Sequence, residues 1–234
     1  MFGETLTPFV IFITVILLSI TVLSYYVSRY YLPTKIRSAY LKSITVLAAA
    51  VETRESGTVG HAQRVAQLTV EVARRMGLRG KNLERIEYAA LLMDMGKANV
   101  PQRLLTKTDR LTLDEWAVIQ SHPRLGAEMV AAVPFVADLS DIILHHHEYW
   151  DGTGYPNGMS GEDIPLASRI LSVTADYDAM VSERPYHPRP LSHEEAMEEI
   201  GRGIGWRYDP KVAEIFLEMM AGEQPGTGTD SRAA

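Results

Sequence analysis

The sequence contains no cysteine, and this absence limits the chemistry of any site. Disulfide bonds, thiolate nucleophiles and zinc–thiolate centres are excluded, so any metal must be held by histidine and carboxylate side chains. The chain also has no excess of positive charge, because 23 Lys and Arg face 29 Asp and Glu for a formal net charge of −6. Proteins that bind nucleic acid polymers usually carry a basic stripe. We therefore expect no such polymer as the main ligand. The negative charge does not exclude a small metal-chelated nucleotide.

Charge of either sign is missing from Thr5 to Ser28, and the middle of this stretch is almost entirely apolar. A membrane-spanning helix needs about 20 apolar residues. Arg29 and Lys35 follow the stretch and only Glu4 precedes it, which places the rest of the chain in the cytoplasm by the positive-inside rule. We predict a single-pass anchor in the cell membrane over residues 1–32, with the span at about 8–28.

A cleaved signal peptide and a buried core helix are the alternatives for this stretch. No Lys or Arg precedes the apolar run and no small-residue cleavage pattern follows it closely, which disfavours a signal peptide. A core helix would show polar residues at helical spacing. With so little chain before Thr5, we expect no extracellular sensor domain.

The sequence also lacks the period-two alternation of a half-buried strand. Apolar residues recur at helical spacing in His61–Met76 and Leu83–Met95. Further helix starts are indicated by capping residues: Thr112 with Glu115, Ser192 with Glu195, and Asp209 before Pro210. These patterns predict an all-α protein.

The domain organisation follows from where these patterns stop. Pro33 is expected to end the membrane helix or kink its exit, and residues 33–50 read as a helical connector. The main domain is predicted over 51–220, interrupted by a turn-rich insert at Asp151–Gly161, and residues 221–234 are predicted to be a disordered tail.

Three consecutive histidines, His145, His146 and His147, precede Glu148 and the glycine-rich insert. Adjacent residues on a helix point about 100° apart, so two of the three can face one centre only near a helix end. Scattered histidines are usually surface or satisfied core groups. A run of three favours a metal site over that alternative.

A series of motifs resembles the HD-GYP domain family over Val51 to Met220. In order they are TVGHAQRV, AALLMDMGK, SHPRLG, HHEYWDGTGYPNGMSGEDIPLASRI, DAMVSERPY and YDP. The resemblance implies an HD-type helical bundle with a glycine-rich GYP loop. It also implies hydrolysis of cyclic di-GMP with two or three iron- or manganese-type ions, through a hydroxide that bridges two metals and attacks phosphorus.

Carried over residue by residue, the family's metal ligands are incomplete. The matching positions are His61, Asp94, His122, His146 and His147. Met93 replaces the histidine of the His-Asp pair, and its thioether is a poor ligand for hard divalent ions. Ala175 replaces a later aspartate, and Asp176 stands one residue too late, which rotates it about 100° on a helix unless a local bulge restores it.

The two losses fall on the same implied metal. The first metal keeps only His61 and Asp94, whereas the second keeps Asp94, His122, His146 and His147. The glutamate of trinuclear members is replaced by Gly57, so we expect fewer ions than in intact family members.

Residues near the substrate are implied by the same resemblance: Lys97, Gly154, Tyr155, Pro156, Arg184 and Tyr186. Asp94 and Lys97 are the expected catalytic residues. For Lys97 the alternative is a cation that favours a helix C-terminus, and for Arg184 it is a solvated surface arginine.

The function expected from these residues is cyclic di-GMP signalling with weak or no hydrolysis, because Met93 and Ala175 remove metal ligands. The partner is cyclic di-GMP or a related cyclic dinucleotide, together with the membrane and a homodimer or signalling protein. An active phosphodiesterase that uses the surviving metal position is the alternative. A phosphohydrolase for another nucleotide is disfavoured by the GYP loop.

Overall fold

The computed structural model describes residues 3–55, 59–183 and 189–222. Gly57, Arg184, Tyr186 and most of the predicted tail therefore lie outside the described residues. The chain divides into two compact units, Met1–Ile44 and Thr45–Ala234.

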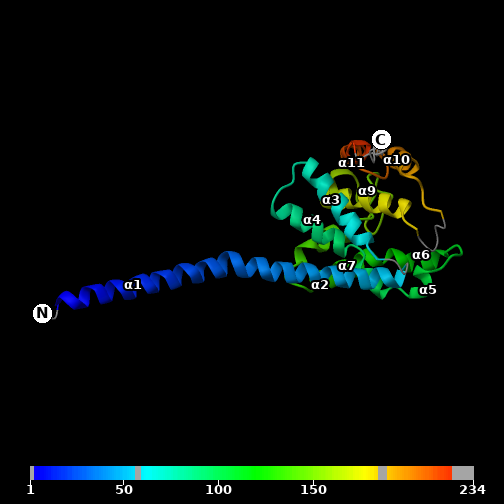
Figure 1. The fold of residues 1–234 in the computed structure, drawn as a ribbon. Coiled ribbons are helices and arrows are strands. Elements are labelled where there is room, and N and C mark those ends of the chain that lie inside the picture. The colour runs from blue at the N-terminus through cyan, green and yellow to red at the C-terminus, as the bar shows by residue number, and fades with distance from the viewer. Residues whose placement is uncertain (1–2, 56–58, 184–188, 223–234) are drawn as a thin grey trace, which may run out of the picture. The chain divides into compact units, whose positions relative to one another are not determined.

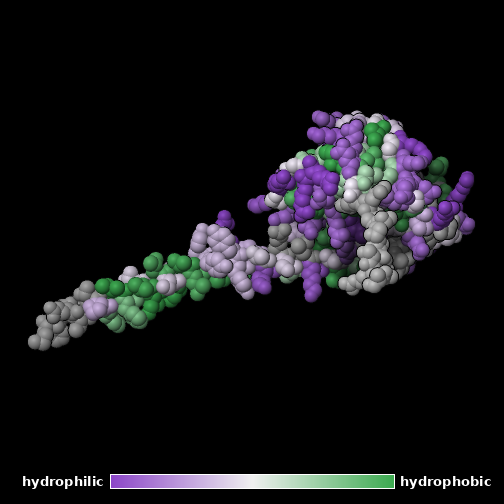
Figure 2. Space-filling model, turned by 45° about the horizontal axis from the view of Figure 1, so that its top comes forward, coloured by the Kyte–Doolittle hydropathy of each residue, from purple (hydrophilic) through white to green (hydrophobic). Residues whose placement is uncertain are grey.

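The first unit is helical and apolar. It contains α1 (Gly3–Tyr26), a π-helical turn η1 (Val27–Tyr31) and the start of α2 (Leu32–Glu55). Figure 2 shows hydrophobic residues along much of α1. The described chain has one helix long and apolar enough to cross a membrane, Pro8–Arg54, with a mean hydropathy of 2.4 and no burial in its most apolar window.

Pro33 does not end this helix, so the first alternative of the prediction is wrong, while a kink at this point stays a prediction. The π-helical turn lies immediately before it, and helix α2 continues through it. Proline has no N–H to donate to the preceding turn, and a single π turn is a common way for a helix to adjust its hydrogen bonding.

The second unit is a helical bundle (Figure 1). Its elements after α2 are α3 (His61–Arg75), α4 (Lys81–Leu92), η2 (Met95–Asn99), α5 (Gln102–Leu105), α6 (Leu113–Gln120), α7 (His122–Ala131), η3 (Ala137–Leu139), α8 (Ser140–Leu144), η4 (Gly161–Asp163), α9 (Leu166–Val181), α10 (His193–Arg202) and α11 (Pro210–Gly222). Within the described ranges there is no strand, only an isolated bridge between Ile204 and Tyr208. The all-α prediction is confirmed.

The main core lies where α3, α9, α10 and α11 meet. Val72, Ile170, Ile200 and Phe216 come from these four helices and are fully buried. Each such side chain stabilises the fold by roughly 1.5–3 kcal/mol relative to an exposed one. This core gives α3 and α9 fixed positions, and both helices carry residues of the site.

The predicted caps are present. Thr112 with Glu115 and Ser192 with Glu195 form complete capping boxes at α6 and α10. Asp209 accepts hydrogen bonds from the backbone N–H groups of Lys211 and Val212 at the start of α11.

Helix α4 ends earlier than the periodicity predicts, at Leu92 rather than Met95. The chain turns at Asp94 and continues as the 3-10 helix η2, which packs against α7. The contact is tight, because a Cβ atom on Gly96 would lie 1.9 Å from the carbonyl oxygen of His122. Glycine is therefore required here, and the turn sets Asp94 opposite the start of α7.

Candidate metal centre

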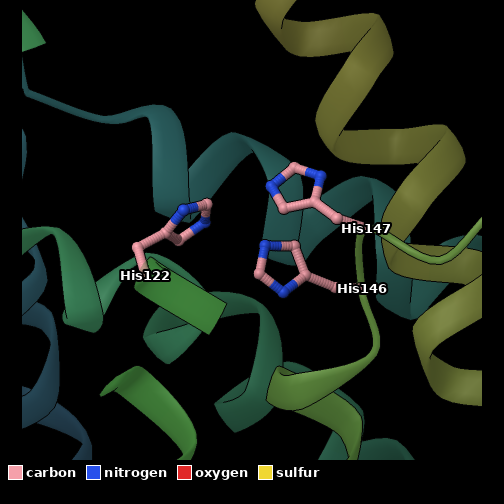
Figure 3. A group of neighbouring side chains, drawn as sticks. All are labelled: His122, His146 and His147. Atoms are coloured by element: carbon pink, nitrogen blue, oxygen red, sulfur yellow. The ribbon is translucent and has the colours of Figure 1, made fainter. Parts of the chain in front are cut away.

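Three imidazoles converge in the second unit (Figure 3). His122 begins α7, and His146 and His147 follow the end of α8. One ring nitrogen of each lies within 4.8 Å of those of the other two. As the 100° spacing predicts, two of the three consecutive histidines turn towards one centre because the run begins where the helix stops.

Backbone carbonyl groups fix the orientation of two of these rings. Nδ1 of His122 lies 2.8 Å from the carbonyl oxygen of Ile119, and Nδ1 of His146 lies 2.6 Å from that of Ile143. A carbonyl oxygen can only accept, so each Nδ1 carries the proton and each Nε2 keeps a lone pair. Both Nε2 atoms are buried and have no hydrogen-bond partner.

The cluster is held in its uncharged form. Burial lowers the pKa of His122 to about 3, and burial also lowers the pKa of His146 and, more strongly, that of His147. Neutral imidazoles that present unpartnered Nε2 atoms are the form in which histidine binds a metal. The donor set of nitrogen atoms with a neighbouring carboxylate fits a divalent transition-metal ion.

Asp94 supplies the neighbouring carboxylate. Its Oδ1 lies 3.4 Å from Nε2 of His122, and its Oδ2 lies 3.1 Å from Nζ of Lys97 and 3.6 Å from Nε2 of His61. Burial alone would raise the pKa of Asp94, but the charge of Lys97 and the contacts with His61 and His122 hold it well below the usual range. The side chain is therefore a carboxylate that can act as a ligand.

The opposite half of the site has a different character. His61, the first residue of α3, directs Nδ1 to Oδ2 of Asp178 at 2.7 Å, and Arg64 donates to both oxygens of the same aspartate. Met93 is 1 % exposed and packs in the core. Ala175 lies on α9 and has no ligand atom in its side chain.

Asp176 does not replace the missing aspartate. Helix α9 is a regular α-helix through this position, with no bulge. The carboxylate pairs with Arg207 at 2.7 Å and accepts a hydrogen bond from the hydroxyl of Tyr208 at 3.0 Å. Burial raises the pKa of Asp176 although Arg207 and Tyr208 oppose this. Neither Arg207 nor Tyr208 was predicted for this role.

The glycine-rich loop is fastened to the histidine run. Nε2 of His145 lies 3.0 Å from the side-chain amide of Asn157, and the buried carboxylate of Glu148 accepts from the backbone N–H of Asn157 and Met159. His145, the first histidine of the run, therefore holds the loop and does not join the cluster. The motifs gave no role to His145 or Glu148, although their place beside the loop is a usable signal.

Tyr155 in the loop contacts the cluster, because its ring stacks on that of His147 with centroids 4.9 Å apart. Gly154 lies against the preceding turn, where a Cβ atom would be 2.3 Å from the backbone nitrogen of Tyr149. Pro156 follows in the same loop. Gly154 thus permits the close approach that places Tyr155 beside His147.

A cavity of about 430 Å³ opens beside the cluster. One part of its lining is His122 and His147 of the histidine cluster with Lys97 and Tyr155, and the remaining wall comes from residues 104–119. The motifs did not single out that wall. The geometry therefore combines neutral imidazoles, a carboxylate and a lysine at the edge of a space that can admit a small molecule.

Comparison with known proteins agrees with this picture. A family model described as HD domain matches residues 45–212. The chain belongs to the HD domain family, which confirms the resemblance predicted from the motifs.

Two curated relatives carry names that specify their substrates. A cyclic di-GMP phosphodiesterase of Thermotoga maritima is 37% identical over 179 residues, covering 75% of this chain and 48% of that protein. A 3'3'-cGAMP-specific phosphodiesterase 2 of Vibrio cholerae is 36% identical over 174 residues, covering 74% of this chain and 33% of that protein. The chain thus spans half or less of the length of these relatives.

The fold is shared with a solved structure, an HDG"Y"P protein from Bdellovibrio bacteriovorus. The TM-score is 0.57 at 21% identity, and the match covers 69% of this chain and 52% of that one.

Proposed function

We propose that this protein binds cyclic di-GMP or a related cyclic dinucleotide at a single divalent metal held by Asp94, His122, His146 and His147, with weak or no hydrolysis. The observation that carries the proposal is the pair of buried, unpartnered Nε2 atoms on His122 and His146. A buried polar atom without a partner is costly. A bound ion removes that cost.

A metal at this position would neutralise negative charge on a phosphate oxygen. The chain's own residues would do the rest. Lys97 lies on the cavity wall and adds a positive charge next to Asp94. Tyr155, stacked on His147, closes one side of the cluster against water.

Weak hydrolysis follows from the opposite half of the site. Met93 and Ala175 offer no ligand where the resemblance implies two, and Asp176 is engaged by Arg207 and Tyr208. His61 and Asp94 alone make a poor site for a second ion. Loss of one metal from a two-metal centre removes several kcal/mol of transition-state stabilisation, which costs orders of magnitude in rate.

An active phosphodiesterase is the second candidate. It is favoured by the intact set around Asp94, by Lys97, and by the phosphodiesterase names of the relatives. This candidate predicts a linear dinucleotide product from the surviving metal position.

We also propose that the N-terminal helix anchors the protein in the cell membrane with the HD domain in the cytoplasm. The support is its apolar span, which is exposed along its length, followed by Arg29 and Lys35. Pairing of two chains through residues 33–50 stays a prediction.

The full chain in lipid nanodiscs, loaded with manganese or iron, tests the function. Metal content, cyclic di-GMP binding by calorimetry and product by chromatography should be measured on one preparation. We expect about one metal per chain, cyclic di-GMP binding that is lost with a chelator, and no product. Linear product would support the second candidate, and absence of both metal and nucleotide binding would contradict both.

A further inference from the structure

The cavity wall away from the metal ligands carries chemistry that the proposed function does not use. It includes Trp116 on α6 together with Asp109 and Arg110 from the segment that precedes this helix. Trp116 is 44 % exposed. An indole face on a cavity wall is a platform on which a nucleobase can stack.

The segment that carries Asp109 and Arg110 is held at both ends. At its start, Lys107 pairs with Glu115 at 2.6 Å. The same carboxylate accepts from the backbone N–H of Thr112 in the capping box of α6. One side chain thus ties the segment to the helix that carries Trp116.

Asp109 and Arg110 themselves are exposed, and neither makes an ion pair or side-chain hydrogen bond with any residue in ranges 3–55, 59–183 and 189–222. An adjacent carboxylate and guanidinium without partners form a matched pair of acceptors and donors. Leu104 and Leu105 also line the cavity and are buried in a small apolar cluster with Val100. Asp109 and Arg110 thus add one acceptor group and one donor group to a wall that also has apolar residues.

This pattern matches guanine and not adenine. Guanine offers N–H donors on its Watson–Crick edge and acceptors at O6 and N7, so a carboxylate accepts from the first edge and an arginine donates to the second. Adenine has an acceptor where guanine has its ring N–H, and a donor in place of O6. On adenine the carboxylate would meet the ring acceptor and the arginine would meet the exocyclic donor, with N7 alone kept as an acceptor for the arginine.

We propose that Trp116, Asp109 and Arg110 form a guanine-selective base site in this cavity, with the phosphate of the same ligand beside Lys97 and the histidine cluster. The inference rests on the proposed function, because it requires that a cyclic dinucleotide enters the cavity. It adds which base is selected and which residues select it.

Binding of cyclic di-GMP and cyclic di-AMP to the full chain in nanodiscs tests the site. We expect wild type to prefer cyclic di-GMP by at least about 10-fold. Trp116→Ala should weaken cyclic di-GMP binding by about 10-fold or more, and Trp116→Phe should keep most of it because stacking is retained. Asp109→Asn and Arg110→Ala should each reduce the preference for cyclic di-GMP over cyclic di-AMP by about 10-fold.

Matched controls lie close by. Asp114→Asn and Arg103→Ala change exposed residues that do not line the cavity, so they should bind both nucleotides as wild type does. All variants should keep wild-type metal content, which shows that the fold and the histidine cluster are intact.

The outcomes separate the two proposals. Suppose that wild type binds cyclic di-GMP, and that the Trp116→Ala and Asp109→Asn variants bind each nucleotide with the same affinity as wild type. The base site is then wrong and the proposed function stands. Equal wild-type affinity for the two nucleotides also overturns guanine selection. If wild type binds neither nucleotide, the proposed function fails and the base site fails with it.

Discussion

The two halves of the candidate metal centre share Asp94 but satisfy their polar groups in different ways. In the half with His122, His146 and His147, backbone carbonyl groups accept hydrogen bonds from Nδ1 of His122 and His146. The Nε2 atoms of the same two rings are buried and have no hydrogen-bond partner. Around His61, the protein itself supplies the counter-charges, because Asp178 pairs with His61 and Arg64. The half with the histidine cluster therefore offers free nitrogen atoms to a cation. In the half with His61, the charged side chains are already paired with one another.

The implied loss of ligands is local. Met93 is buried as an ordinary core residue, and Asp176 is bound within the protein by Arg207 and Tyr208. Neither arrangement disturbs the three imidazoles. We expect the halves to act independently apart from Asp94, so each can be altered while the other serves as a reference.

Restoring the missing ligands should have the largest effect. Met93→His with Ala175→Asp should raise the metal content from about one to about two ions per chain. We expect cyclic di-GMP hydrolysis to rise on the order of 1000-fold, because a second ion stabilises charge on the transferred phosphoryl group. Metal analysis and chromatography of the product measure both effects.

Met95→His with Ala175→Asp is the matched control, since it adds the same side chains with histidine two residues away. It should gain neither metal nor activity. A double reversion that takes up a second ion yet stays inactive would show that missing ligands are not the reason for weak hydrolysis.

Removing ligands from each half should give unequal losses. His146→Ala should weaken metal binding by at least about 100-fold, since even residues that only orient a ligand cost 10–100-fold. His61→Ala should have a much smaller effect, because His61 is held by Asp178 rather than turned to the histidine cluster. Titration of manganese into metal-free protein measures the difference, and equal losses would contradict the independence of the halves.

The fold and the half of the site with His122, His146 and His147 could be predicted from the sequence, because helical periodicity, capping residues and long motifs are local signals. His122, His146 and His147 were predicted as ligands, and the structure brings them together. The engagement of Asp176 by Arg207 and Tyr208 was not predictable, because it joins segments about 30 residues apart that carry no shared motif. The cavity wall formed by Asp109, Arg110 and Trp116 was not predicted for the same reason, since only folding brings these residues beside Lys97.

Gly96 links the two halves, because it allows η2, with Asp94 before it, to lie against the start of α7. Gly96→Ala would place a Cβ atom 1.9 Å from the carbonyl oxygen of His122, so backbone must shift. We expect a loss of about 2–3 kcal/mol in the free energy of unfolding and weaker metal binding. Gly201→Ala, in α10 with nothing within 4 Å of the added atom, should be neutral or slightly stabilising. Chemical denaturation of both variants tests the contrast, and a Gly96→Ala variant as stable as wild type would contradict the close packing.

Asp178 gives the smallest effect and tests the neutralised half alone. Burial would raise its pKa, but hydrogen bonds from His61 and Arg64 lower it from 3.8 to about 2. A carboxylate with a depressed pKa in the folded state stabilises the fold above its unfolded pKa, and this contribution is lost as the pH falls from about 4 towards 2. Asp178→Asn should therefore lower the free energy of unfolding by about 2 kcal/mol at pH 7, and its difference from wild type should shrink as the pH falls through this range. Asp163→Asn, which changes an exposed residue of η4, should show no such difference.

Because Asp178 reaches the shared Asp94 only through His61, manganese binding should be nearly unchanged in Asp178→Asn. A large loss of metal from this variant would show that the two halves act as one site.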